Sequence, residues 1–353
     1  MLRVMLLHED KRGYGKGGGA ESMLRDMTTA LERAGHKVRW WQNDEPLPQA
    51  IETFRPDVCH IMTIHNFIGL APAVWLQQQR IPHVWSLMDY WMFCGNRMLL
   101  MGDNSDESCP AVAGVCDPVQ CQSHRAPVRY MEVVTQSPII ALNEYTAAIY
   151  ERNGIRVYDV GPLGVDHEYF CPDPSKRAPK RVMTHSAWPE YPTKGMHILK
   201  AALEQTGIKG HLVTHAPREK VRDELQRAEI HVFPSCYQET FGLCLAEARA
   251  CGCACIASDV AGARAQIHHG YDGLLVPPRN VDALAAALTM LMNDDAMREE
   301  LGRAARQSIE ERGTLAHMAR TYTRIYRRVI DEFKGVRKDA VIRSACAEVR
   351  VSR

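Results

Sequence analysis

The stretch from residue 230 to 278 constrains the fold of this chain more than any other part of the sequence. Ile230 to Pro234 is a short apolar run, which predicts a buried strand. A loop then leads into an Ala- and Leu-rich helix that ends at Cys251-Gly252, where glycine can adopt a left-handed helix stop. A second apolar run, Cys253 to Ala257, follows at once. Strand, loop, helix and strand in this order predict a βαβ unit of a parallel sheet.

Two glutamates and the start of a helix supply hydrogen-bonding groups in this stretch. Glu239 falls beyond the carboxyl end of the first strand, where parallel sheets bind ligands, and Glu247 lies within the helix. Carboxylate oxygens accept strong hydrogen bonds from sugar hydroxyls. The amides of Phe241, Gly242 and Leu243 lie at the helix N-terminus, where unpaired N–H groups and the helix dipole favour phosphate. Taken alone, two glutamates are more simply explained as a helix cap and a solvated helix face.

The surrounding residues form a longer ordered series of motifs. The series consists of Pro234-Ser235, Glu239-Thr240-Phe241-Gly242, Glu247-Ala248, Gly252, and Asp272-Gly273-Leu274-Leu275-Val276-Pro277-Pro278. This series resembles the motifs of retaining, nucleotide-sugar-dependent glycosyltransferases of the GT-B fold, in particular glycosyltransferase family 4. The family pattern is an apolar strand, P-S, E-x-F-G-x-x-x-x-E-A, a Gly turn and then D-G-x-L-V-P-P. The resemblance implies an α/β protein with two Rossmann-like parallel-sheet domains that face each other across a cleft.

The resemblance also implies where the domains begin and end. Gly164-Val165-Asp166, with Phe170 and Pro172, fits the family motif at the crossing between the domains. The expected parts are an acceptor domain over 1–165 with a cysteine-rich loop at 92–125, a linker at 166–180, a donor domain over 181–315, a helix at 316–335 that crosses back to the acceptor domain, and a tail at 336–353.

Several donor-binding roles carry over from the family to matching positions. Lys194 is expected to hold the donor diphosphate, together with the backbone from Thr240 to Leu243. Glu239 is expected to hold the transferred sugar and Glu247 the ribose of the nucleotide. The family's arginine before the lysine is absent, since Ser186-Ala187-Trp188 stand in that region. The resemblance also implies that catalysis requires no metal or other cofactor.

The first domain offers further candidates for the cleft. A glycine-rich loop ends in Gly18 and Gly19 between the first strand and helix, and in the family this loop faces the donor phosphates. It matches neither a Walker motif nor a strict G-x-G-x-x-G. Many relatives carry His-Asp after the fourth strand, whereas Met88-Asp89 stand here and leave Asp89 as the ionisable candidate. His65 and Asn66 follow the strand near Pro56 to Ile61 and are candidates for the acceptor side.

Four cysteines cluster in the loop from residue 92 to 125. They are Cys94, Cys109, Cys116 and Cys121, with fourteen, six and four residues between them. A cluster of four thiolates suggests a structural zinc, but the spacing is not that of a standard zinc ribbon, so zinc and free thiols stay equal alternatives.

Composition narrows the partners but does not identify the acceptor. The formal net charge of +1 gives no overall attraction to nucleic acid or to an anionic membrane. No apolar run reaches membrane-spanning length, so we expect a cytoplasmic protein, with peripheral membrane association left open. The expected donor is a UDP- or GDP-sugar, and the expected acceptor is a saccharide, a lipid-linked glycan or a small aglycone.

Two other functions stay open at this point. One is transfer to modified DNA bases, for which a local cleft with Lys11, Arg12, Lys16 and Arg25 could bind phosphates. The other is a non-catalytic nucleotide-sugar-binding protein, because the family's histidine and arginine are both replaced. Slow donor hydrolysis without acceptor would distinguish an enzyme from a binding protein.

Overall fold

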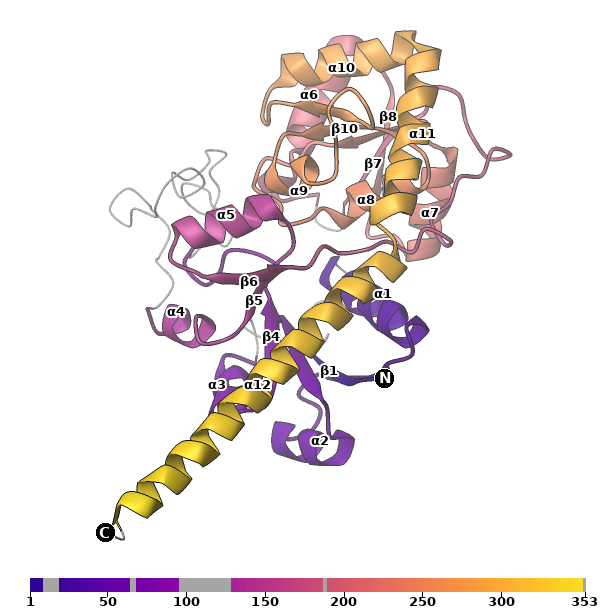
Figure 1. Cartoon of the computed structure of the whole chain (residues 1–353). Coiled ribbons are helices and arrows are strands. Elements are labelled where there is room, and N and C mark those ends of the chain that lie inside the picture. Colours follow the sequence, from indigo (N-terminus) through magenta and orange to yellow (C-terminus); the bar gives the residue numbers. More distant parts are fainter. Residues whose placement is uncertain (9–18, 64–67, 95–127, 187–188, 352–353) are drawn as a thin grey trace.

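The computed structural model describes residues 1–8, 19–63, 68–94, 128–186 and 189–351. Its strands form two separate parallel sheets, one in each half of the chain, and helices surround both (Figure 1). Parallel sheets need crossover connections, and helices placed on both faces bury the strands on both sides. The α/β class with two parallel sheets, predicted from the sequence, is therefore confirmed.

The first sheet has six strands in the order β2-β1-β3-β4-β5-β6. Every neighbouring pair is parallel, and β1 pairs with β2 from Arg3↔Lys37 to Leu7↔Trp41. The strands are β1 (Arg3–His8), β2 (Lys37–Trp41), β3 (Val58–Thr63), β4 (His83–Ser86), β5 (Ile139–Ala141) and β6 (Val157–Val160).

Alternate residues of each strand face opposite layers of helices, because successive side chains point to opposite faces of a sheet. In β1, Val4 and Leu6 share a core cluster with residues of α1 and α12, whereas Met5 and Leu7 share another with residues of α2 to α5. The helices of this half are α1 (Gly19–Arg33), α2 (Leu47–Phe54), α3 (Ala71–Gln78), α4 (Val128–Val134) and α5 (Glu144–Arg152).

The second sheet has five parallel strands in the order β11-β10-β9-β7-β8. In β10, Ala254 and Ile256 pack with residues of α6 and α10, and Cys255 and Ala257 pack with residues of α7 and α8. The strands are β7 (Val182–Ser186), β8 (Gly210–Thr214), β9 (Ile230–Phe233), β10 (Ala254–Ser258) and β11 (Leu274–Val276). The helices are η3 (Pro192–Lys194, a 3₁₀ turn), α6 (Met196–Thr206), α7 (Arg218–Arg227), α8 (Leu243–Ala250), α9 (Ala261–Arg264), α10 (Val281–Asn293) and α11 (Asp295–Arg312).

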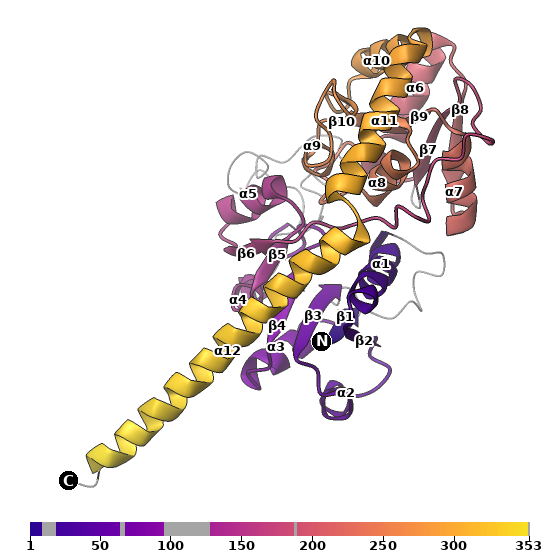
Figure 2. The same ribbon diagram turned by 45° about the vertical axis from the view of Figure 1, so that its right-hand side comes forward.

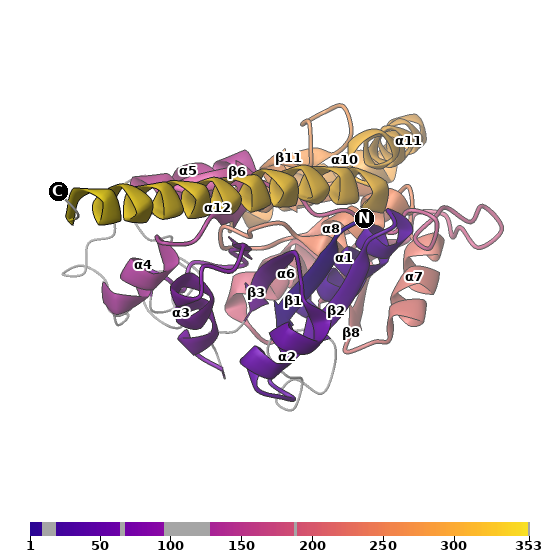
Figure 3. The ribbon, with the colours of Figure 1, turned by 60° about the horizontal axis from the view of Figure 1, so that its bottom comes forward.

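The last helix, α12 (Leu315–Val351), begins at the second half and lies along the first half beside α1 (Figures 2 and 3). It is longer than the helix expected at 316–335 and continues through most of the segment expected to form a tail. A buried polar network fastens it to the first sheet. His60 Nδ1 lies 2.7 Å from the Tyr326 hydroxyl, and His60 Nε2 lies 2.8 Å from Ser86 Oγ. Burial lowers the pKa of His60 to about 3, so the ring is neutral and belongs to the core.

Candidate functional site

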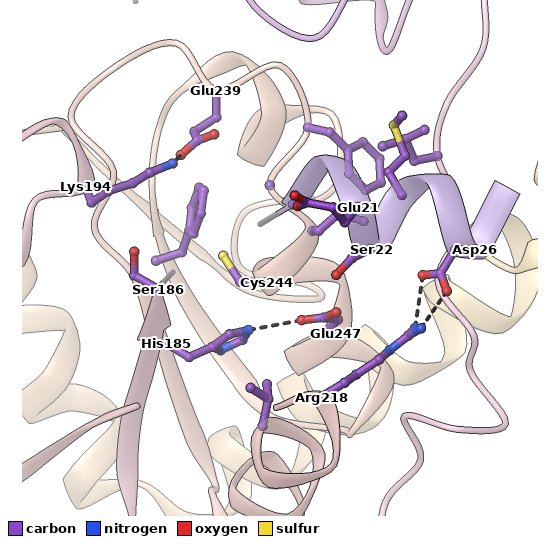
Figure 4. Close-up of a pocket in the computed structure, with 18 of the residues that line it drawn as sticks. Glu21, Ser22, Asp26, His185, Ser186, Lys194, Arg218, Glu239, Cys244 and Glu247 are labelled. Atoms are coloured by element: carbon purple, nitrogen blue, oxygen red, sulfur yellow. Dashed lines mark hydrogen bonds and ion pairs between the residues drawn. The ribbon is translucent and has the colours of Figure 1, made fainter. Parts of the chain in front are cut away.

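A cavity of about 1240 Å³ lies between the two halves, and residues from both sheets line it (Figure 4). From the first half it is lined by His8, Thr63 and Leu142, each at or just beyond the carboxyl end of a strand. From the second half it is lined by His185, Ser186 and Pro234 in the same relation to their strands. Parallel sheets bind ligands at this edge, so the topology directs both halves toward one site.

Lys194 and Glu239 meet at one end of this cavity (Figure 4). Lys194 Nζ donates to Glu239 Oε1 at 2.7 Å, and the side chains are 26% and 10% exposed. Ser235 Oγ donates to the same oxygen at 3.0 Å, and the Tyr237 hydroxyl donates to Oε2 at 2.6 Å. A carboxylate has about four acceptor positions, so Glu239 keeps one on Oε2 for a further donor. Lys194 likewise keeps at least one N–H for an anion in the cavity.

A tight backbone contact fixes Lys194 beside this loop. Gly195, directly after Lys194, has a φ of 67°. A Cβ at this position would lie 1.8 Å from the carbonyl oxygen of Pro234 at the end of β9. Only glycine allows this approach, so the Lys-Gly pair of the family motif has a steric cause here.

The first half of the chain also holds the loop that carries Glu239. Thr240 Oγ1 donates to the Met88 carbonyl at 2.6 Å, and Asn143 Nδ2 donates to the Thr240 carbonyl at 2.6 Å. The Tyr90 hydroxyl donates to the Gln238 carbonyl at 2.8 Å. The position of Glu239 in the cavity therefore depends on both halves.

Helix α8 presents its N-terminus to the cavity. Gly242 is its N-cap with a φ of 88°, and no side chain caps the helix. Phe241, Gly242 and Leu243 all line the cavity. Glu239 does not act as a cap, since its described partners are Lys194, Ser235 and Tyr237. The amides in this region keep the capacity to bind an anion.

Glu247 lies one turn further along α8 and is not on a solvated face. It lines the cavity and its residue is 8% exposed. His185 Nε2 lies 3.0 Å from Glu247 Oε2, and His185 Nδ1 lies 3.2 Å from Nε2 of the buried His231. Desolvation, together with the nearby His185, lowers the pKa of His231 well below its usual value, so this ring is neutral.

An ion pair spans the cavity between the halves (Figure 4). Arg218, the first residue of α7, contacts Asp26 of α1 through both oxygens, at 2.8 Å and 3.0 Å. Burial raises the pKa of Asp26 to about 6, although the Arg218 guanidinium opposes this shift. The carboxylates of Glu247 and Asp166 act in the same direction as burial.

The raised pKa of Asp26 predicts a dependence of stability on pH. Folded protein takes up a proton at Asp26 near pH 6, whereas an unfolded Asp does so near about pH 4. The stabilisation that Asp26 contributes is therefore fully present below its unfolded pKa, and it is lost as the pH rises through its folded pKa. The free energy of unfolding of Asp26→Asn should therefore rise relative to that of the parent chain as the pH increases from about 4.5 to 7.5. Urea unfolding at both pH values measures the difference. Asp331→Asn, at an exposed residue of α12, is the control, because its difference in unfolding free energy from the parent chain should not change with pH. A difference that is equally independent of pH for Asp26→Asn would contradict the prediction.

The other predicted residues have varied placements. Asp89 lines the cavity, and its Oδ1 accepts the Trp91 amide at 2.9 Å. Met88 and Gly19 also line the cavity, and Cys94 is buried. The remaining candidates lie outside the described residues, and they are Gly18, His65, Asn66, Cys109, Cys116 and Cys121, together with Lys11, Arg12 and Lys16 of the possible DNA-binding cleft. Within the described ranges, no three His, Cys, Asp or Glu side chains are grouped as metal ligands.

Sequence reasoning missed several residues of the site. Tyr237 binds Glu239, and Arg218 pairs with Asp26 across 192 positions of sequence, for which the sequence has no local signal. His231 did leave a signal. It is a polar residue in the otherwise apolar run from Ile230 to Pro234 that is expected to form a strand, and Glu247 is on the helix that follows this run.

Comparison with known proteins finds a family match in the second half of the chain. Residues 196–308 match the model of the family described as Glycosyl transferases group 1. The D-inositol 3-phosphate glycosyltransferase of Kribbella flavida is 40% identical over 89 residues, which are 25% of this chain and 21% of that protein. The chain covers less than a third of the length of the curated relatives it matches, from 12% for an exopolysaccharide phosphotransferase of Streptomyces coelicolor to 31% for the D-inositol 3-phosphate glycosyltransferase of Jonesia denitrificans.

Solved structures resemble the chain over nearly its whole length. Sucrose-phosphate synthase from Thermosynechococcus elongatus has a TM-score of 0.71 at 18% identity and covers 94% of this chain and 100% of its own. Anabaena HepE, solved with UDP and glucose, has a TM-score of 0.68 at 17% identity and covers 92% and 99%. The chain thus has the GT-B fold and resembles the group 1 glycosyl transferases.

None of the helices in the described part of the chain is both long and apolar enough to cross a membrane.

Proposed function

We propose that this protein transfers a sugar from a nucleoside diphosphate sugar to an acceptor with retention of configuration at the anomeric carbon. The observation that carries the proposal is the convergence of Lys194, Glu239 and Glu247 in one cavity. The cavity also joins them to the uncapped N-terminus of α8. A UDP complex of a protein with this fold, and relatives named as glycosyltransferases, support a nucleotide-sugar donor.

Each group has a role that its remaining hydrogen-bonding capacity allows. The cation of Lys194 and the amides around Gly242 bind the diphosphate and stabilise the charge that it gains on leaving. The last acceptor position of Glu239 takes one sugar hydroxyl. Glu247 has one oxygen on His185 and directs the other to the ribose hydroxyls.

Retention requires that the new bond form on the face from which the diphosphate leaves. The C1–O bond to the phosphate breaks, the C1–O bond to the acceptor forms, and the acceptor proton passes to the departing phosphate oxygen. Met88 carries no titratable group at the position where relatives place a histidine, and Asp89 accepts the Trp91 amide. We therefore assign the proton to the phosphate and not to a side-chain base.

The donor is a UDP- or GDP-sugar, and the acceptor is a saccharide, a lipid-linked glycan or a small aglycone. Related proteins bear names that include transfer to inositol phosphate and to a diphospho-undecaprenol-linked sugar. A thermal-shift screen of UDP- and GDP-sugars tests the donor. Nuclear magnetic resonance of the product's anomeric carbon tests retention.

Replacement of the two glutamates tests the assignment of roles. Glu247→Gln should weaken binding of both the free nucleotide and the full donor by roughly 1.5–3 kcal/mol, since a charge-assisted hydrogen bond is lost. Glu239→Gln should leave binding of the free nucleotide unchanged and reduce turnover of the donor, because sugar contacts tighten as charge develops. Calorimetry with the nucleotide and initial rates with the donor separate the two effects.

Glu219→Gln is the matched control, because Glu219 lines the same cavity but is exposed on α7. It should change neither quantity. If the Glu239 and Glu247 variants behave like this control, the two carboxylates are not ligands and the proposed function loses its main support.

A further inference from the structure

Two hydrogen-bonded histidines connect Glu247 to the core of the second sheet. His185 is at the end of β7 and lines the cavity, whereas His231 is in β9 and is fully buried. The rings are 5.2 Å apart and steeply inclined, with His231 Nε2 at 3.2 Å from His185 Nδ1. His185 Nε2 then contacts Glu247 Oε2 at 3.0 Å. Figure 4 shows the outer contact, where the His185 ring points to the Glu247 carboxylate.

The hydrogen-bond partners of the His185 and His231 rings determine which ring nitrogens carry protons. His231 Nδ1 is buried and has no hydrogen-bond partner in the described structure. If the His231 proton were on Nδ1, a buried N–H would have no acceptor, which folded proteins avoid. With the proton on Nε2, His231 donates to His185 Nδ1, and only an acceptor is left unpaired. His185 then has its own proton on Nε2 and donates it to Glu247.

In this arrangement His231 affects the orientation of His185 and Glu247, which line the cavity. A neutral His185 can present its N–H to Glu247 only if its Nδ1 accepts a hydrogen bond or is left unpaired. His231 supplies that hydrogen bond and also fixes the plane of the His185 ring. Glu247 is then held through Oε2, so that Oε1 is presented to the cavity.

A packing role alone does not explain His231. Its neighbours in β9, Ile230 and Val232, are apolar and fully buried. An imidazole with an unpaired nitrogen costs more to bury than an aliphatic side chain of similar size. A leucine would fill this place without that cost, but it could not donate to His185.

We propose that His231 is a positioning residue that acts through His185 to orient Glu247 toward the ribose 2′- and 3′-hydroxyls of the nucleotide. The inference rests on the proposed function, in which Glu247 holds the ribose. It adds that ribose recognition depends on a residue that the nucleotide does not touch. Orientation of a contacting group by a hydrogen-bonded neighbour is well known for metal-binding histidines, where the neighbour affects affinity without touching the metal.

The experiment compares affinities for a ribonucleotide and its deoxy form. Dissociation constants for UDP and 2′-deoxy-UDP, and for GDP and 2′-deoxy-GDP, are measured on the full chain and on His231→Leu. The parent chain should prefer the ribonucleotide, and His231→Leu should reduce this preference by about 2- to 10-fold, the range of one hydrogen bond. His231→Gln should retain the preference, since its amide can replace the Nε2 donor. His231→Asn, whose shorter amide cannot reach His185, should lose it and serves if the leucine variant fails to fold.

His83→Leu is the control for loss of a buried histidine far from the cavity. His83 is 1% exposed and hydrogen-bonds Ser137 in the first half. It should lower the melting temperature and leave the ribose preference unchanged. The proposal is overturned if His231→Leu and His231→Asn keep the parent preference, or if His231→Gln loses it as fully as they do. If the parent chain binds neither UDP nor GDP, the proposed function itself fails and the role of His231 falls with it.

Discussion

Replacement of Lys194 by methionine should reduce turnover of the nucleotide-sugar donor by about 10²- to 10³-fold, the loss typical of one group that stabilises charge in a transition state. Lys194 lines the cavity and is held 2.7 Å from Glu239. In the proposed reaction its cation lies close to the departing diphosphate, which gathers charge. Because that charge grows as the C1–O bond breaks, kcat should fall more than KM rises. Steady-state rates over a range of donor concentrations measure both.

Folding should survive this change. Glu239 keeps its hydrogen bonds from Ser235 and Tyr237, and Lys194 is partly exposed. Lys200→Met is the matched control, since Lys200 is on α6 just beyond η3 and its side chain is 77% exposed. Equal rates for the two variants would remove Lys194 from the reaction. A rise in KM with kcat unchanged would instead make it a residue that only binds the donor.

Much of this site was predictable because its residues are local in sequence. The strand Ile230 to Pro234, the loop with Glu239 and the helix with Glu247 follow one another in a βαβ unit. The structure has β9, the loop and α8 in this order. Lys194 was identified by the family motif, and the fold then brings it to Glu239 through the neighbouring strands β7 and β9.

Contacts between the halves were not predictable in the same way. Asp26 is on α1 of the first half and Arg218 is on α7 of the second half. No local sequence pattern of either helix shows that the two side chains face each other. The contacts from Asn143 and Tyr90 to the Glu239 loop are made to backbone carbonyls, which any residue could offer. Such contacts depend on how the two sheets are placed, which a sequence pattern does not encode.

Short elements at the margins of the fold were also missed. No strand is predicted for Val157–Val160, where the structure has β6 at the edge of the first sheet. Its residues are only half-buried, and Asp159 pairs with Arg324 of α12, so the apolar signal of a strand is weak. Helix α2 was missed because it is only eight residues long.

Removal of Arg249 should have the largest effect on stability. Arg249 of α8 and Asp272 are paired at 2.8 Å, with side chains 1% and 0% exposed. Asp272 also accepts from Ser308 Oγ at 2.6 Å and from the His268 amide at 2.7 Å. Arg249→Met leaves a buried carboxylate without its main counter-charge, and a broken buried pair typically costs about 3–5 kcal/mol. Urea unfolding followed by far-UV circular dichroism measures the loss of unfolding free energy.

A double replacement separates the loss of the pair from the loss of packing. Arg249→Met with Asp272→Asn removes both charges, and the amide oxygen can still accept from the His268 backbone. Replacement of a whole buried pair is often neutral, so the double variant should be more stable than the sum of the single effects implies. Arg264→Met is the exposed control, because its pair with Asp259 is 41% and 39% exposed and should contribute less than about 1 kcal/mol.

The same pair connects the Asp-Gly motif to the helix of the glutamate motif. Asp272 is fully buried and its carboxylate bonds Arg249, two residues after Glu247 on α8, so it anchors the helix that carries Glu247. In the proposed function, Arg249→Met should therefore weaken nucleotide binding as well as stability, although Arg249 is buried and does not line the cavity. The double variant should recover part of both. If Arg249→Met destabilises the chain but leaves the nucleotide dissociation constant unchanged at a temperature where the variant is folded, then α8 keeps its position without this anchor. Asp272 would in that case serve the stability of the second sheet alone.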